Sequence, residues 1–262
     1  MLRLTNTRKW RIFALAFALS GVFLTGCKGV NILSKDEEIR IGREASVEIE
    51  KEYEVTKNPI DAAYVERIGQ KIVVANNITD FPYTFKLLES NEVNAFALPG
   101  GPIYVFRGLL DLTEGNEDEL ACVIGHEIVH IHRRHIAKMY SQGVFTDLLI
   151  IFGTQGALRS AAEVIRIFRD MQYSRDDEYE SDKLGLRFAY KAGYDPHGMI
   201  RFFEKMQRLE KQGKGDLISN NLRTHPLTEN RIKRAKEEID KLVPEVNAEV
   251  ENEYFLKLES KK

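Results

Sequence analysis

Residues 116–135 read NEDELACVIGHEIVHIHRRH, and this stretch decides the fold that we expect. It opens with an Asn-x-x-Glu capping pair, which predicts a helix over residues 117–139. The helix contains the pattern H-E-x-x-H at residues 126–130. Positions four apart on a helix lie about 40° apart around its axis and one turn along it. The imidazoles of His126 and His130 can therefore reach one metal ion.

The residue between the two histidines supplies the second half of the motif. Glu127 stands where a carboxylate takes a proton from metal-activated water instead of binding the metal. A purely structural helix would have no reason to bury histidines against Ile124, Ile128 and Val129 without a partner, because buried polar groups need one. The motif therefore predicts a zinc site in which Glu127 is the general base.

A catalytic zinc site needs a third protein ligand, and residues 173–182, YSRDDEYESD, offer several acids. A helix is expected over residues 173–192. On it Glu178 and Asp182 share a face, so one can bind the metal while the other accepts the N–H of a ligand imidazole. Glu180 points about 200° away from Glu178. We choose Glu178 as the ligand and Asp182 as the outer support. A solvated acidic helix face is the alternative.

The N-terminal segment differs in kind from the rest of the chain. Residues 1–12 carry four basic residues and no acid, and residues 12–25 are almost entirely apolar. This layout is typical of a secretion signal, since a transmembrane helix needs about 20 apolar residues. The sequence LTGC at residues 24–27 resembles the bacterial lipoprotein signal, which implies acylation of Cys27 and removal of the residues before it. The resemblance also implies export to the outer membrane, because Lys28 and not an acid follows the cysteine. A signal anchor, or an ordinary signal peptide with a chance cysteine, is the alternative.

The composition excludes several classes of protein. Of the 262 residues 43% are hydrophobic, which is enough to build a core. The 38 basic and 40 acidic residues leave no positive surplus for phosphates, so no nucleic-acid partner is expected. Two cysteines cannot form a disulfide framework or a thiolate metal cage, and Cys122 is expected in the core. Without its first 26 residues the chain would have 34 basic and 40 acidic residues.

The hydropathy pattern predicts an α+β fold that is mostly helical. Further helices are expected from Lys35 to about Val55, after Asn58-Pro59, after Asp195-Pro196 and at the end of the domain. Between residues 83 and 106 the pattern alternates around a Pro-Gly-Gly-Pro turn, which we interpret as a small, largely antiparallel sheet. Residues 144–171 are interpreted as a mobile lid or a packed short helix, and residues 211–216 as a glycine-rich loop. The expected divisions are a signal peptide over 1–26, a lipidated tether over 27–34, one zincin-like domain over 35–243 and a tail over 244–262.

Several motifs occur here in the order of one known family. They are HEIVH at 126–130 followed by Arg134-His135, Glu178-x-x-x-Asp182, NAFALPGG at 94–101, and THP at 224–226 with Arg231. With these motifs the chain resembles the CAAX-prenyl-protease-type gluzincin metallopeptidases, over about residues 35–240, and above all their soluble, lipid-anchored bacterial members. The resemblance implies one zinc ion bound by His126, His130 and Glu178, with Glu127 as the general base.

Three roles stay open for His225, the central residue of the THP motif. In some family members the matching histidine is a reversible fourth zinc ligand that would hold the enzyme latent. It could equally donate a hydrogen bond to the developing oxyanion. The third possibility is a loop histidine in front of a proline.

The remaining histidines are interpreted as structural or solvated. His132 and His135 fall on the far side of a continuous helix from the two motif histidines. His197 starts a helix and has the same interpretation.

The resemblance implies a zinc-dependent endopeptidase of the bacterial cell envelope, located on the periplasmic face of the outer membrane. Its expected substrates are unfolded or misfolded envelope proteins, and it would contact the membrane through the N-terminal lipid. An extended substrate would add to a strand by main-chain hydrogen bonds, which tolerate many sequences. That strand consists of Asn94, Ala95, Phe96 and Ala97. Two other classes stay open: a latent or inactive zinc-stabilised chaperone that uses the same cleft, and a zinc hydrolase of non-peptide envelope substrates.

Overall fold

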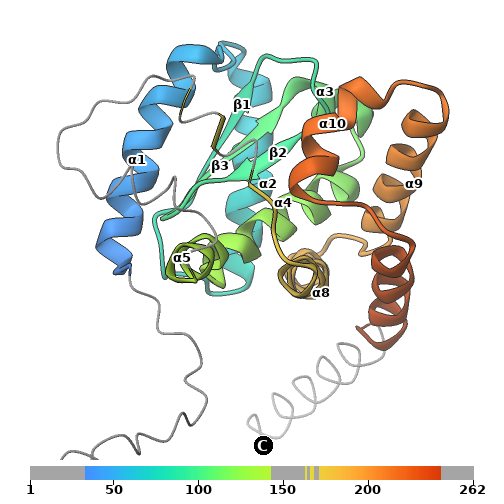
Figure 1. Ribbon diagram of the computed structural model, residues 1–262. Helices are drawn as coiled ribbons and strands as arrows, with labels where there is room; N and C mark the ends of the chain where they lie inside the picture. The colour runs from blue at the N-terminus through green and yellow to red at the C-terminus, as the bar shows by residue number, and fades with distance from the viewer. Residues whose placement is uncertain (1–32, 143–162, 164–165, 168–170, 243–262) are drawn as a thin grey trace, which may run out of the picture. The chain divides into compact units, whose positions relative to one another are not determined.

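The computed structural model describes residues 33–142, 163, 166–167 and 171–242, all within one compact unit (Figure 1). The predicted signal peptide with Cys27, most of the tether, the C-terminal tail and nearly all of the predicted lid lie outside the described residues. These divisions stay predictions. Within the described chain the predicted α+β, mostly helical architecture with a small sheet is confirmed.

Two helices precede the sheet, and each begins where its cap predicts. α1 runs Lys35–Glu52, and Ser34 caps it in a capping box in which the Ser34 amide donates to Glu37 Oε2 at 2.7 Å. α2 runs Pro59–Ala75 behind the N-cap Asn58. One face of α2 is buried and packs toward the sheet and α4.

The sheet has three strands in the order β1-β3-β2: β1 Thr84–Leu88, β2 Ala95–Ala97 and β3 Pro102–Phe106. β2 and β3 form an antiparallel pair, but β1 lies parallel to β3, so the sheet is mixed and not largely antiparallel as predicted. Alternating side chains occur in both arrangements, so the sequence pattern could not give the strand direction. β2 is left as an edge strand of this sheet.

The described chain after β3 consists of helices and loops. The helices are α3 Arg107–Leu112, α4 Glu117–His132, α5 His135–Ser141, α8 Arg175–Lys191, α9 Gly198–Lys211, α10 Gly215–Thr224 and a final helical stretch over residues 229–242. We find no membrane-spanning candidate among the helices of the described residues. α10 was not predicted: the glycine-rich loop expected over residues 211–216 overlaps its start at Gly215, and no helix was expected between that loop and Thr224.

The predicted helix over residues 117–139 is in fact two helices. α4 ends at His132, Arg134 adopts a left-handed conformation with φ 56° and ψ 40°, and α5 begins at His135. The Arg134 side chain secures this bend, because its Nε atom donates to Glu38 Oε1 of α1 at 2.6 Å. The break changes the direction of the helix axis, so the side chains from His135 onward do not point where a continuous helix would place them.

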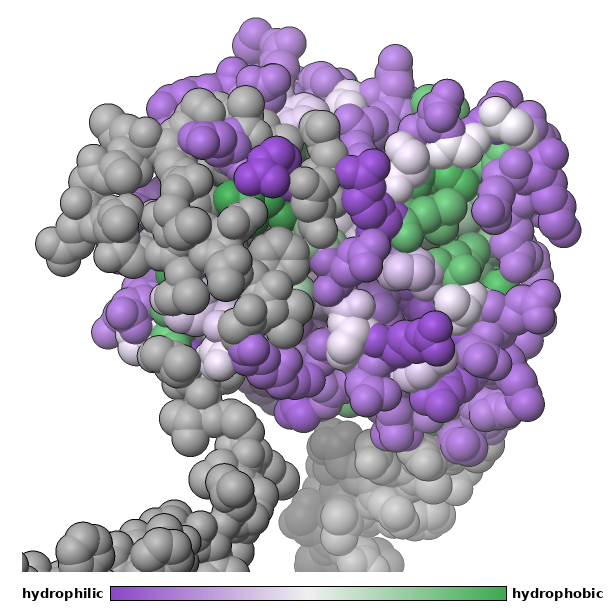
Figure 2. Space-filling view, viewed as in Figure 1, coloured by the Kyte–Doolittle hydropathy of each residue, from purple (hydrophilic) through white to green (hydrophobic). Residues whose placement is uncertain are grey.

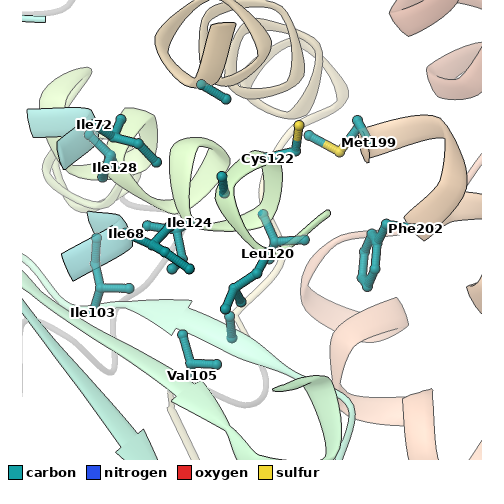
Figure 3. Close-up of a cluster of buried hydrophobic side chains, with 14 of the residues drawn as sticks. Ile68, Ile72, Ile103, Val105, Leu120, Cys122, Ile124, Ile128, Met199 and Phe202 are labelled. Atoms are coloured by element: carbon teal, nitrogen blue, oxygen red, sulfur yellow. The ribbon is translucent and has the colours of Figure 1, made fainter. Parts of the chain in front are cut away.

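The core surrounds α4, whose residues from Glu119 to Ile131 are all buried. Figure 3 shows the packing of side chains from α2, β3, α4 and α9: Ile68, Ile72, Ile103, Val105, Leu120, Cys122, Ile124, Ile128, Met199 and Phe202. Cys122 lies in this core as predicted. α4 packs most extensively against α8.

Two glycines allow α4 and α8 to approach each other closely. A Cβ atom on Gly185 of α8 would lie 2.7 Å from the backbone nitrogen of His126, and one on Gly125 of α4 would lie 2.8 Å from the Gly185 carbonyl oxygen. Backbone atoms cannot move aside as a flexible side chain can, so only glycine fits at this crossing. The crossing places the acids of α8 beside the histidines of α4.

Candidate metal centre

Four side chains converge beside the crossing of α4 and α8. They are His126 and His130 of α4, Glu178 of α8 and His225, which follows α10; all four are buried, and their ligand atoms lie within 4.8 Å of one another. His126 Nε2 is 2.9 Å from His130 Nε2 and 3.3 Å from His225 Nδ1. Glu178 Oε1 is 2.9 Å from His225 Nδ1 and 3.4 Å from His130 Nε2.

This arrangement fits one zinc ion. Zinc bonds to nitrogen and oxygen of about 2.0–2.1 Å imply separations of about 3.3 Å between the ligands of a tetrahedron. The observed separations scatter around that value. His126 Nε2 also faces two other ring nitrogens, and one N–H cannot satisfy both contacts. A cation at the centre removes this conflict.

A buried arginine supports the carboxylates of the cluster. Arg231 donates to both oxygens of Asp182, through Nε and Nη2, each at 2.7 Å, and its Nη1 lies 2.6 Å from Glu178 Oε2. Burial alone would raise the pKa of Asp182, but the charge and hydrogen bonds of Arg231, together with the contact to His126, outweigh it and hold that pKa below its ordinary value. Burial is likewise outweighed by His225 and Arg231 at Glu178, whose pKa lies well below its usual range. Both carboxylates are therefore ionised.

Asp182 connects this arginine to the first motif histidine. Its Oδ1 atom lies 3.0 Å from His126 Nδ1, which is the contact expected of an outer support. The contact places the His126 proton on Nδ1 and leaves Nε2 to face the cluster. This role of Arg231 could not be predicted from local sequence patterns, because its contact with Asp182 joins residues 49 positions apart.

Glu127 lies beside the cluster and is buried. Its Oε1 atom is 3.5 Å from His225 Nε2, and Oε2 has no hydrogen-bond partner among the residues that the structure describes. The backbone amide of Ala97, at the end of the edge strand β2, interacts with the same carboxylate. Burial raises the pKa of Glu127, a shift toward the value of a group that accepts and returns a proton.

His225 belongs to the cluster and is only 5% exposed. Burial lowers its pKa, but the Glu178 and Glu127 carboxylates outweigh that effect and raise it above the ordinary value. The ring of Tyr173 stacks on His225 with centroids 5.2 Å apart and lies 3.7 Å from that of His130. No sequence pattern predicted this position for Tyr173.

The other three histidines divide into two kinds. His132 pairs with Asp80 at 3.0 Å, and His197 is largely exposed and bonds Asp195, as expected of structural or solvated residues. His135 instead is 1% exposed, and its Nδ1 lies 3.0 Å from Nδ1 of His130. The prediction that it faces away from the motif histidines is wrong, because the backbone break at Arg134 turns it back toward them.

An apolar pocket opens next to Glu127 and His126. It is narrow, with a cavity volume of about 30 Å³, and its hydrophobic walls come from α4, α9 and the loop after α10. The apolar lining residues are Val123, Met199, Phe202, Phe203, Met206 and Leu227. Figure 2 shows hydrophobic residues gathered in a hollow over α9 and α10.

An H-E-x-x-H helix whose histidines meet a glutamate from a second helix defines a metallopeptidase site of the zincin type. The model of peptidase family M48 matches residues 59–239, and the chain belongs to that family. Peptidases of this family use zinc, which confirms the predicted cofactor and the predicted class, a zinc metallopeptidase.

Curated relatives agree with this assignment. The chain is 26% identical to the beta-barrel assembly-enhancing protease of Yersinia pestis over 86% of its own length and 49% of that protein. The corresponding protease of Escherichia coli (strain K12) is 25% identical over 88% and 50%. The mitochondrial metalloendopeptidase OMA1 of Schizosaccharomyces pombe is 30% identical over 79% and 62%. The chain thus spans about half the length of the bacterial relatives. The names of these relatives support the family but not specifically the CAAX-protease type.

Proposed function

We propose that this chain is an endopeptidase of the bacterial cell envelope that cleaves unfolded or misfolded proteins, using one zinc ion held by His126, His130 and Glu178. The observation that carries the proposal is the convergence of these ligand atoms beside the buried carboxylate of Glu127. The relatives named as beta-barrel assembly-enhancing proteases support protein substrates in the envelope. Within the family, the motifs favour the soluble, lipid-anchored bacterial members.

The chain's own residues account for proton transfer. When bound, zinc supplies Lewis-acid activation of water and of the substrate carbonyl. Glu127 accepts the proton of the attacking water at its Oε2 atom, which has no hydrogen-bond partner within the described chain, and returns it to the leaving amine nitrogen. Asp182 holds the Nδ1 proton of His126 throughout.

The substrate would lie along β2. Residues Asn94, Ala95, Phe96 and Ala97 form the edge of the sheet, and within the described chain no strand pairs with the outer side of β2. A peptide added there uses main-chain hydrogen bonds, so many sequences are accepted once they are unfolded. Because the Ala97 amide interacts with Glu127, this strand leads to the catalytic carboxylate.

His225 is proposed as the reversible fourth ligand. Its Nδ1 atom is one of the four converging atoms, so a substrate carbonyl must displace it before reaction. This arrangement would keep the enzyme latent until a substrate segment enters. Once displaced, the same imidazole could donate to the oxyanion.

The location rests on the N-terminal segment. We propose that Cys27 is acylated and holds the domain on the periplasmic face of the outer membrane. Several acyl chains, each contributing about 0.8 kcal/mol per buried methylene, would make this anchoring stable. Release of the chain from membranes after Cys27→Ser would test the anchor.

The test of the function is the variant Glu127→Gln, with Glu114→Gln as a matched control at an exposed position. The enzyme proposal requires that Glu127→Gln retain zinc and lose cleavage of unfolded casein by about 10²-fold or more, while Glu114→Gln cleaves normally. A chaperone would suppress aggregation equally well in all three proteins and cleave in none. Mass spectrometry of products from casein and from murein would identify a hydrolase of non-peptide substrates.

Metal content tests the ligand assignment separately. Glu178→Ala should lose stoichiometric zinc, measured per folded chain. Full zinc content in that variant would overturn Glu178 as a ligand.

A further inference from the structure

His130 has one ring nitrogen toward the candidate metal position and one away from it. Its Nε2 atom lies 2.9 Å from His126 Nε2, and its Nδ1 atom lies 3.0 Å from Nδ1 of His135. A histidine whose Nε2 lone pair binds a metal carries its proton on Nδ1. His130 is then the donor in the contact with His135. His135 must accept through Nδ1.

The other nitrogen of His135 agrees with this assignment. Nε2 lies 3.1 Å from Glu180 Oε2 and 3.7 Å from Asp177 Oδ1. Ionised carboxylates only accept, so they place the His135 proton on Nε2 and leave the Nδ1 lone pair for His130. Both ends of the imidazole therefore require the same tautomer.

The backbone is bent in a way that creates this contact. In one continuous helix, residues five apart are about 140° apart around the axis, and His135 would face away from His130. Instead Arg134 takes the left-handed conformation, which costs about 1–2 kcal/mol at a non-glycine residue. Such strain persists where the surrounding structure enforces it, and it marks a candidate functional site.

We propose that His135 is a positioning residue that orients the metal ligand His130 by accepting its Nδ1–H, with the His135 proton held by Glu180. The proposal rests on the proposed zinc site and extends it. Carboxylates or backbone carbonyls usually make this contact in metal sites. Here a second imidazole transmits the effect of a carboxylate.

Three substitutions separate positioning from packing. Asn places its amide oxygen near the position of a histidine Nδ1, Gln places it near Nε2, and Leu provides apolar volume without an acceptor. Positioning predicts that the zinc dissociation constant rises about 10–100-fold in His135→Leu and His135→Gln but stays within about threefold of wild type in His135→Asn. Competition between the full chain and a zinc chelator measures this constant with the metal alone.

The stability of the metal-free variants provides the second readout. A buried amide without partners destabilises a core more than leucine does, so a packing role predicts that His135→Asn is the most damaged variant in every measurement. Positioning predicts the opposite order for zinc affinity, with Asn above Leu. If His135→Leu fails to fold, the comparison of zinc affinity between His135→Asn and His135→Gln still tests the proposal. Wild-type zinc affinity in His135→Gln, or zinc affinities that follow the metal-free stabilities, would overturn the proposal.

His130→Ala distinguishes this proposal from the zinc site on which it depends. Loss of zinc in His130→Ala together with wild-type affinity in His135→Leu and His135→Gln would reject only the role of His135. Stoichiometric, tight zinc in His130→Ala would reject the site itself.

Discussion

Each histidine of the H-E-x-x-H motif contacts a series of side chains that ends in an arginine. The two series differ in how deeply they are buried. On one side the arginine is 5% exposed, and on the other it is 49% exposed. We call them the Arg231 relay, which consists of Arg231, Asp182 and His126, and the Arg133 relay, which consists of Arg133, Glu180, His135 and His130.

The difference in burial shows that similar ion pairs do not contribute equally to the free energy of unfolding. In the Arg231 relay the charges are removed from water, so each one depends on its partner. In the Arg133 relay Glu180 is 34% exposed, and water can replace Arg133. In the Arg231 relay, the arginine should therefore contribute most to the free energy of unfolding. In the Arg133 relay, the largest contribution should come from the buried contact between His135 and His130.

The largest effect is expected where the buried relay is broken. Arg231→Ala leaves the buried carboxylates of Asp182 and Glu178 without their arginine partner, which should lower the free energy of unfolding by about 3–5 kcal/mol. Urea unfolding followed by circular dichroism measures this change. Lys233→Ala, at a side chain that is 75% exposed, is the control and should change it by less than about 0.5 kcal/mol. Equal losses in the two variants would contradict the comparison.

Removal of zinc should have the next largest effect. At free zinc 100 times above the dissociation constant, the metal contributes about 2.7 kcal/mol, which a chelator should remove. The metal-free chain should still unfold cooperatively, because Arg231 stays paired with Asp182 and Glu178 when the metal is removed. Thermal melts with and without chelator check both points. An unfolded metal-free chain would mean that the Arg231 relay depends on zinc.

The glycine crossing should affect both relays at once, because α8 carries both Asp182 and Glu180. A methyl group at Gly185 would meet the His126 backbone at 2.7 Å, so Gly185→Ala should cost about 1–3 kcal/mol and weaken zinc binding. Gly215→Ala is the matched control, since a Cβ there meets no atom within 4 Å. Wild-type zinc affinity in Gly185→Ala would show that the relays tolerate a shift of α8.

The parts of the site that lie on regular helices could be predicted from the sequence. Glu178 and Asp182 share a face at i and i+4, and the structure places both beside His126. The fold class followed from the same reasoning, because capping residues and apolar stripes are local signals. Ser34 and Asn58 cap helices at the predicted positions.

The parts that depend on tertiary packing could not be predicted in this way. His135 reaches His130 only through the left-handed residue Arg134, and helix periodicity assumes that no such residue interrupts the helix. Arg231 comes from a distant helical stretch over residues 229–242. The parallel pairing of β1 with β3 is also set by the path of the chain, which residue alternation does not record.

The smallest effect is expected at the exposed end of the Arg133 relay. The Arg133 side chain lies 2.6 Å from Glu180 Oε1, but exposed ion pairs contribute about 0–1 kcal/mol, since water solvates both charges when they separate. Arg133→Ala should therefore lower the free energy of unfolding by less than about 1 kcal/mol and leave zinc affinity within about twofold of wild type. Glu180 still accepts from His135, so the tautomer that His130 requires is kept. Parallel urea unfolding and chelator competition on Arg133→Ala and Arg231→Ala give the ratio of the two arginine contributions. A loss of zinc affinity in Arg133→Ala as large as in His135→Leu would mean that the exposed arginine, not the buried imidazole pair, controls this side of the site.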